Sequence, residues 1–356
     1  MESHGILSLK QFTDINLDDP FFDSLKEDYP GFDKWFEKKG PEKAFVFYSD
    51  DGLLDGFLYT KQETEAVTDV EPNFSSAHRL KIGTFKVNAH GTKLGERFMK
   101  KIFDIAMACK VTEAYVTVFP KHAGLISLLS RYGFKKVATK SVGGKLEDVM
   151  TRSMVKLGSI PTESFPLIKV TPVTKHYLLA IYPKFHTRLF PDSILKNESA
   201  SIVTDTSSTN SIHKVYLAAS PGTEDMKPGD TIFIYRTADN GKAAEYSSVV
   251  SSLCVVEEFR WMSSFKSLQD FLDYTLPYSV FTHEELVDFY KQKKYNRVIR
   301  FSYNAAFPKR VIRKSLIEDA GMSRSVRWSF FEVTRQQFER TMQLGDVDAS
   351  IIVNSP

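Results

Sequence analysis

Cysteine is scarce in this sequence, and so are long apolar runs. The 356 residues include two cysteines, Cys109 and Cys254, each inside an apolar stretch. Two thiols so far apart provide neither a disulfide framework nor the spacing of a metal site, so we expect two buried thiols and no bound metal. The apolar runs, of which 177–182 is an example, are much shorter than the roughly 20 residues that cross a bilayer. We therefore expect no membrane-spanning segment.

An excess of one charge is also lacking over the chain as a whole. Lys and Arg number 47 against 44 Asp and Glu, a formal net charge of +3, which by itself identifies no partner. Residues 1–5 do not have the basic and then apolar character of a signal peptide, so we expect a cytoplasmic protein. A chain of 356 residues is long for one hydrophobic core, and 42% hydrophobic residues, with 28 Phe, supply material for two.

The region 1–157 has the pattern of a mixed α/β domain. Apolar residues at spacings of three and four predict a helical region over 19–39, interrupted at Pro30-Gly31. The stretches 44–48 and 56–60 flank a Ser-Asp-Asp-Gly turn and predict a β-hairpin. The pattern then predicts a strand, a long helix, a strand, a short helix and two strands, at 80–87, 95–110, 114–119, 122–131, 135–139 and 148–155.

The loop between the strand at 80–87 and the long helix is the most informative segment. It reads His90-Gly91-Thr92-Lys93-Leu94-Gly95. A glycine-containing turn at this place lets backbone N–H groups converge at the positive end of a helix dipole, where an anion binds. A plain tight turn would have a similar sequence, so the order of the surrounding elements has to decide.

That order resembles the GNAT family of N-acetyltransferases over about residues 10–155. In that family, an Arg/Gln-x-x-Gly-x-Gly/Ala loop binds the pyrophosphate of coenzyme A through its backbone amides. The matching positions are His90, Lys93 and Gly95, and the first two depart from the pattern. The resemblance implies acetyl-CoA as the cofactor, held by Phe85, Val87, His90, Gly91, Thr92, Lys93, Leu94, Gly95 and Glu96.

The short helix before Tyr132-Gly133-Phe134 carries the second part of the resemblance. Family members often place an Asn eleven residues before this Gly and a Tyr four residues before it; those positions are His122 and Leu129 here. The resemblance implies that His122 contacts the coenzyme. Leu129 has no proton to give to the departing thiolate, which is the usual role of the Tyr.

The acceptor amine has to lose a proton, directly or through water, unless it arrives neutral. The strand at 80–87 contains no acid. The candidate bases upstream of it are Glu63, Glu65, Asp69, Glu71 and His78. Glu65 and His78 are the best placed of these, on the neighbouring strand and at the mouth of the central one. The alternative for each is a solvated surface side chain.

The composition changes after residue 157. Five prolines between 158 and 192, followed by a segment rich in Ser, Thr, Asn and Asp, predict a connector at 158–212 that is packed in its first half. We expect a second domain at 213–356. Its predicted strands lie at 214–217, 231–235, 248–257 and 297–303, and its helices at 267–274 and 283–293.

A Met-Lys-Pro-Gly-Asp turn at 226–230, followed by a strand, is similar to the PUA-like group, which includes ASCH domains. The predicted fold class is therefore α/β: a GNAT fold, with a mixed central sheet and flanking helices, followed by a PUA-like α+β small barrel. PUA-like domains commonly bind RNA or modified bases, so the resemblance implies a nucleic-acid partner.

Cations and aromatic residues are interleaved near the C-terminus. Residues 296–340 include ten Lys or Arg and four Asp or Glu. Cations for phosphates and rings for stacking are typical of single-stranded RNA binding. We predict that Arg300, Arg310, Arg313 and Trp328 contact RNA, such as a tRNA or a modified base. The alternative is a solvated basic rim over an aromatic core.

Three functions agree with these patterns. The leading hypothesis is an acetyl-CoA-dependent N-acetyltransferase whose acceptor amine is carried by RNA or associated with it, and is selected by the second domain. The second is an acetyltransferase for a protein lysine or a small amine, with the second domain as a docking module. The third, suggested by Leu129, is an inactive acyl-CoA sensor that binds nucleic acid.

Overall fold

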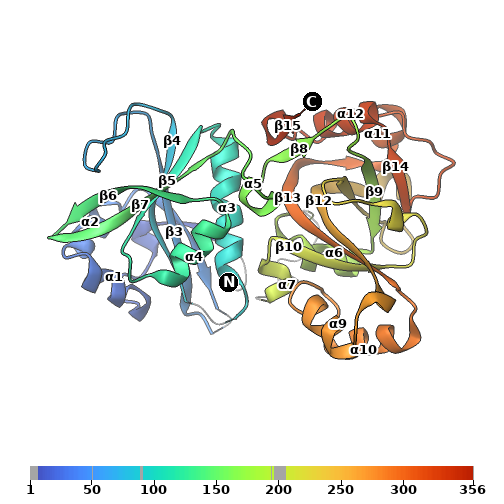
Figure 1. The fold of residues 1–356 in the computed structure, drawn as a ribbon, viewed down its shortest axis with the longest axis horizontal. Helices are drawn as coiled ribbons and strands as arrows, with labels where there is room; N and C mark the ends of the chain where they lie inside the picture. The colour runs from blue at the N-terminus through green and yellow to red at the C-terminus, as the bar shows by residue number, and fades with distance from the viewer. Residues whose placement is uncertain (1–6, 50, 89–90, 194, 196–205, 356) are drawn as a thin grey trace. The chain divides into compact units, whose positions relative to one another are not determined.

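The computed structural model describes residues 7–49, 51–88, 91–193, 195 and 206–355. They form two compact units (Figure 1). The first lies within Met1–Lys156 and the second within Leu157–Glu198 and Thr206–Pro356.

A seven-stranded sheet of order β1-β2-β3-β4-β5-β7-β6 forms the centre of the first unit. Strands β4 and β5 are parallel, and the other neighbours are antiparallel. The strands are β1 Ser8–Gln11, β2 Lys43–Tyr48, β3 Leu54–Glu63, β4 Arg79–Val87, β5 Glu113–Val118, β6 Lys135–Val142 and β7 Lys145–Ser153. The helices are η1 Phe12–Asp14, η2 Pro20–Phe22, α1 Asp23–Asp28, α2 Phe32–Lys38, α3 Leu94–Ala108 and α4 Ala123–Arg131.

Side-chain alternation along β3 places helices on both faces of this sheet. Phe57 packs in a cluster with Phe22 and Phe36 from the N-terminal helical region. At the neighbouring position, a Cβ on Gly56 would lie 2.3 Å from the ring of Phe98 on α3, so the close approach of that helix requires glycine. Because successive residues of a strand point to opposite faces, α2 and α3 cover opposite faces.

The predicted elements of this unit are confirmed, with shifted ends. The helical region is interrupted where predicted, at Gly31, whose φ of 91° suits glycine. The last two strands form a longer hairpin than predicted, closed by Gly143 and Gly144. Cys109 ends α3 and is only partly buried, so the expectation of two buried thiols was right for Cys254 alone.

A six-stranded sheet of order β10-β13-β12-β11-β9-β14 forms the centre of the second unit, where β9 and β11 are parallel. A small two-stranded sheet pairs β8 with β15. The strands are β8 Ile168–Val170, β9 His176–Ile181, β10 His213–Ala218, β11 Thr231–Arg236, β12 Val249–Trp261, β13 Arg297–Ile312, β14 Phe330–Val333 and β15 Ile352–Asn354. The α-helices are α5 Pro161–Ser164, α6 Pro183–Leu189, α7 Ser207–Asn210, α8 Ala244–Ser247, α9 Leu268–Thr275, α10 His283–Gln292, α11 Arg313–Glu318 and α12 Arg335–Leu344, and the 3₁₀ helices are η3 Pro191–Ser193, η5 Thr223–Asp225, η6 Met262–Ser264 and η7 Ala349–Ile351.

Part of the predicted connector belongs to the sheet of the second unit. Strand β9 falls inside 158–212, yet it lies between β11 and β14 in the sheet. Its residues Tyr177, Leu178, Leu179 and Ile181 are all buried. A strand covered on both faces shows no polar alternation, so a short apolar run among prolines did not look like a strand.

The Pro-Gly-Asp turn closes onto the segment that precedes β9. Gly229 has a φ of 93°, as the turn requires. The Asp230 carboxylate accepts hydrogen bonds from the backbone N–H groups of Lys227 at 2.8 Å and Lys175 at 2.9 Å. The predicted combination of a mixed α/β domain with a second α+β domain is confirmed. No helix among the described residues is both long and apolar enough to cross a bilayer.

Candidate functional site

The parallel strands β4 and β5 diverge, and a cavity opens where they do. Their pairing runs from Arg79–Glu113 to Ile82–Val116, while β4 continues to Val87 and β5 to Val118. A cavity of about 1350 Å³ is lined by residues 82–88 and 116–118 of these two segments. The cavity therefore lies at the carboxyl ends of two parallel strands, a common place for ligands in α/β folds.

Two helices begin at this cavity. Helix α3 follows β4, and Gly91, Lys93, Leu94 and Gly95 at its start line the cavity. Helix α4 follows β5, and residues 121–125 at its start line it too. Each helix brings the positive end of its dipole, so this part of the cavity favours an anion.

Most of the residues predicted to hold the coenzyme lie on this cavity. Thr92 and Glu96 lie outside its lining, and His90 lies outside the described residues. The predicted positions on the lining are Phe85, Val87, Gly91, Lys93, Leu94, Gly95 and His122.

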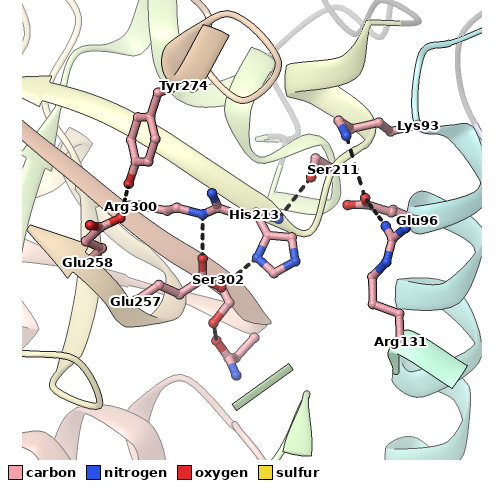
Figure 2. Close-up of polar contacts among 11 residues, drawn as sticks. Lys93, Glu96, Arg131, Ser211, His213, Glu257, Glu258, Tyr274, Arg300 and Ser302 are labelled. Atoms are coloured by element: carbon pink, nitrogen blue, oxygen red, sulfur yellow. Dashed lines mark hydrogen bonds and ion pairs between the residues drawn. The ribbon is translucent and has the colours of Figure 1, made fainter. Parts of the chain in front are cut away.

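Glu96 fixes the loop instead of facing the cavity. Its buried carboxylate lies 3.9 Å from Lys93 Nζ and 3.5 Å from Arg131 Nη1 at the end of α4 (Figure 2). Its backbone N–H donates to the Lys93 carbonyl at 2.9 Å. Lys93 itself has the left-handed φ of 58° and forms the N-cap of α3. Glu96 therefore holds the start of α3 in place.

Gly95 allows α3 and α4 to approach closely. A Cβ at Gly95 would lie 2.9 Å from Leu128 Cδ2, and Leu128 also lines the cavity. The family pattern attributes this glycine to room for phosphate, whereas here a side chain would first meet the neighbouring helix.

A buried carboxylate joins the end of α1 to the start of α4. Asp28 accepts hydrogen bonds from Lys121 and lies 2.9 Å from His122 Nε2. Burial alone would raise the pKa of Asp28, but the hydrogen bonds from Lys121 and His122 hold that pKa below its ordinary value. His122 thus lies on the cavity, bound to a carboxylate distant in sequence.

Two further carboxylates on the lining each accept a hydrogen bond from a tyrosine. Tyr29 Oη donates to Glu147 at 2.5 Å, and burial together with this carboxylate raises the pKa of Tyr29 well above its ordinary value. Tyr115 Oη donates to Glu63 at 2.5 Å. Burial would raise the pKa of Glu63, but Tyr115 and the charges of two nearby lysines hold it below its ordinary value.

The two candidate bases lie elsewhere. Glu65 is exposed, and His78 is half-buried with Nε2 at 3.0 Å from Gln62 Oε1; both are outside the cavity lining. Glu63, which was in the wider set of candidates, lies on the lining. Strand alternation could have favoured it, because Glu63 points to the same face as Lys61 on β3.

Leu129, at the usual position of the catalytic Tyr, is fully buried and outside the lining. Tyr29 and Tyr59 are the tyrosines that line the cavity in the part of the chain the structure describes. Tyr29 precedes Pro30-Gly31, between α1 and α2, and no family pattern pointed to it.

In the second unit, the residues predicted to bind RNA make internal contacts. Arg300 Nε donates to Glu257 at 2.9 Å, and Glu257 also lies 2.6 Å from His213 Nδ1 (Figure 2). Arg310 donates to the backbone carbonyls of Phe307 and Asp192. Two of the four predicted residues are thus bound by carboxylate or carbonyl oxygens.

The other two predicted residues, Arg313 and Trp328, lie on a cavity of about 600 Å³ in the second unit. The Arg313 guanidinium lies 4.5 Å from the centre of the Trp328 ring, which is 9% exposed. Buried polar atoms without a hydrogen-bond partner occur on three lining residues: Arg313 Nε, Trp328 Nε1 and Thr237 Oγ1. Such atoms are rare in folded proteins, where strain, a bound water or a ligand accounts for them.

No protein-family model and no curated protein sequence matches this chain. Solved structures similar to it include two kinds. The first kind has the GNAT acetyltransferase fold: Ard1 from Thermoplasma volcanium, at 16% identity and a TM-score of 0.33 over 42% of this chain and 99% of that one, and Naa20 from Chaetomium thermophilum in complex with a bisubstrate analogue, at 17% and 0.34 over 42% and 86%. The second kind is the ASCH protein of Zymomonas mobilis, at 9% identity and a TM-score of 0.31 over 48% of this chain and 95% of that one.

Proposed function

We propose that the first unit is an acetyl-CoA-dependent N-acetyltransferase. The observation that carries this proposal is the cavity between the diverging β4 and β5, with the starts of α3 and α4 on its lining. The helix starts suit a pyrophosphate. The edge of β4 beyond Ile82 is no longer paired with β5 and suits the amide groups of an extended pantetheine arm. A coenzyme bound in this way places its thioester between the strands.

In the proposed reaction, the nitrogen of the acceptor amine attacks the thioester carbonyl carbon and the carbon–sulfur bond breaks. One proton leaves the nitrogen and one joins the thiolate. Glu63 attracts the amine and accepts its proton through water. Tyr29 keeps its phenolic proton near neutral pH, as any tyrosine does, and its hydroxyl turns from Glu147 to give that proton to the thiolate in place of the acid that Leu129 cannot be.

Calorimetry with acetyl-CoA, combined with an assay of thiol release in the presence of amines, tests this proposal. We expect Tyr29→Phe to lower kcat about tenfold or more while acetyl-CoA affinity stays the same, as loss of a general acid predicts. Tyr48→Phe, in the same unit but outside the lining, is the matched control. Binding of acetyl-CoA without turnover of any amine would favour the inactive sensor, and no binding at all would end the proposal.

We also propose that the second unit selects an acceptor carried by RNA or associated with it, by binding a base in the cavity of Arg313 and Trp328. Arg313 Nε and Trp328 Nε1 are donors only, and base edges offer carbonyl and ring-nitrogen acceptors. The exposed ring of Tyr182 on the same lining provides a stacking surface. The three buried polar atoms without partners are the specific observation that favours this proposal.

Titration of uridine and cytidine 5′-monophosphates into the full chain tests base binding, with ribose 5-phosphate as the arm that lacks a base. We expect Thr237→Val to weaken binding about fivefold or more, because it removes a hydroxyl at little change in shape. Trp328→Phe should weaken binding at least as much, because it removes the indole N–H together with part of the ring. Thr341→Val is the matched control, since Thr341 also has a buried hydroxyl without a partner but lies outside this cavity. Equal binding of ribose 5-phosphate would contradict a base site.

A further inference from the structure

The cavity of the first unit is basic, although the chain as a whole is nearly neutral. Seven lysines and three acids line it. The lysines are Lys39, Lys61, Lys81, Lys86, Lys93, Lys121 and Lys140, and the acids are Asp28, Glu63 and Glu147. A coenzyme rich in phosphate accounts for positive charge near the helix starts, so the remaining lysines need a separate explanation.

The lysines fall into groups at different places along β4. Lys93 and Lys121 lie at the starts of α3 and α4, close to the end of β4 at Val87. Lys81 lies six residues before Val87, a separation of roughly 20 Å along a strand. Lys81 therefore lies far from the phosphate end, on the side where the acceptor enters if the coenzyme follows the gap between the strands.

Lys61 and Lys81 form a like-charged pair across two strands. They are directly opposite in the register of β3 and β4, and both line the cavity. Like charges directly opposite each other on one face of a sheet are destabilising. The carboxylate between them is that of Glu63, at 3.5 Å from Lys61 Nζ and 3.7 Å from Lys81 Nζ. Two cations therefore share one anion.

The neighbouring lysines differ from this pair. Lys39 is bound to Glu42 at 2.7 Å, and Lys140 to Asp69 at 2.6 Å, so each of them has a carboxylate partner. Lys86, next to Val87, donates to the Phe21 carbonyl and to Ser24 Oγ, so away from the end of β4 it is Lys61 and Lys81 that share a single carboxylate. Two cations that share one carboxylate on the wall of a cavity favour an anionic ligand there.

We propose that the acceptor of the acyl group carries an anionic group, a phosphate or a carboxylate, which Lys61 and Lys81 bind while Glu63 faces the amine. The inference rests on the proposed acyl transfer and names its substrate class. Glu63 supplies one negative charge for the two cations, and the anionic group of the acceptor supplies the second. An acceptor with a positive or neutral group at this place gains nothing from the pair.

Three amines of matched length test the proposal with the full chain: 2-aminoethyl phosphate, β-alanine and ethanolamine. We expect one or both anionic amines to have a kcat/KM at least tenfold above that of ethanolamine, and added salt to reduce the difference. Comparison of 2-aminoethyl phosphate with β-alanine distinguishes a phosphate from a carboxylate. In parallel, calorimetry of the protein saturated with coenzyme A, which has no acyl group to transfer, measures binding of each amine without turnover.

Variants separate a binding role from a structural one. We expect Lys81→Met to raise KM for the anionic amine at least fivefold with little change for ethanolamine, and Lys61→Met to do the same. Lys43→Met, an exposed lysine of the same sheet outside the lining, is the control.

The proposal is overturned if ethanolamine is used or bound as well as the anionic amines, or if none of the three binds. It is also overturned if Lys81→Met affects all three equally. Acetyl-CoA binding that persists in those cases leaves the proposed acyl transfer in place, whereas loss of coenzyme binding in the unaltered protein ends both.

Discussion

Positively charged side chains have different surroundings in the two units. In the first unit, Lys61 and Lys81 border a cavity of about 1350 Å³ and share one carboxylate. In the second, the arginines of the C-terminal stretch mostly have partners of their own: Arg297 is held by both oxygens of Glu224 at 2.8 and 3.2 Å, and Arg324 by Glu245 at 2.8 Å.

This difference shows what a count of charges omits. The stretch 296–340 is more basic than the chain as a whole. Its arginines nevertheless bind carboxylates, carbonyl oxygens and an aromatic ring within the unit. The lysines of the first unit are spread over the sequence and come together only in the fold. Whether a cation is available for a ligand depends on its partners, which are distant in sequence.

The largest expected effect concerns the extent of the second unit. We expect residues 157–356 to fold alone, and residues 213–356 to lack a cooperative unfolding transition, because the shorter fragment has lost β9 from between β11 and β14. Residues 1–156 should fold and keep acetyl-CoA binding. Circular dichroism during urea titration measures this, and a cooperative transition for 213–356 would show that β9 is dispensable.

Next in size is the loss of coenzyme affinity from a side chain at the start of α3. Gly95→Val should weaken acetyl-CoA binding more than tenfold, since its Cβ would lie 2.9 Å from Leu128 Cδ2 at the cavity wall. Gly124→Ala is the matched control, because Gly124 also lines the cavity but has open space around its Cβ position. A folded Gly95→Val protein with unchanged affinity in calorimetry would place the coenzyme elsewhere.

A smaller effect is expected from acidification, which should lower the free energy of unfolding of the second unit more than that of the first. Burial lowers the pKa of His176 to about 4 and that of His186 to about 3, from an ordinary 6.5. Between the folded pKa of about 4 and the ordinary 6.5, the unfolded chain binds more protons than the folded chain. The free energy of unfolding of residues 157–356 should therefore fall as the pH falls from about 6.5 toward 4.

In the first unit, the lowered pKa of Asp28 gives stability that is present above its ordinary pKa and is lost only as the pH falls through the lower folded value. Residues 1–156 should therefore resist mild acid better. Urea titrations of both fragments at several pH values measure the difference. His176→Gln should reduce the pH dependence of 157–356; an unchanged slope would mean that this imidazole is not kept neutral by the fold.

The smallest expected effect is at the two bases chosen from the sequence. Glu65→Gln and His78→Gln should each change kcat less than twofold, because both side chains lie outside the cavity lining. Glu63→Gln should lower kcat clearly more. Rates of thiol release measure all three, and a large loss in Glu65→Gln alone would return the role of base to that residue.

The sequence by itself determined the local elements. Apolar periodicity placed the β2–β3 hairpin, β4, α3 and α4 within a few residues of their observed bounds. The Pro-Gly and Pro-Gly-Asp sequences marked turns that the structure contains. It also determined that the loop after β4 starts a long helix. These features depend on residues a few positions apart, and the pattern of side chains records them directly.

Only the tertiary structure decided which side chains meet. His122 lies against Asp28, 94 residues away, and Tyr115 against Glu63, 52 residues away. The cavity itself exists because two strands from different parts of the chain diverge after four paired positions. β9 became an interior strand because β11 and β14 cover its two edges. Such pairings depend on long-range packing, for which periodicity within one segment carries no information.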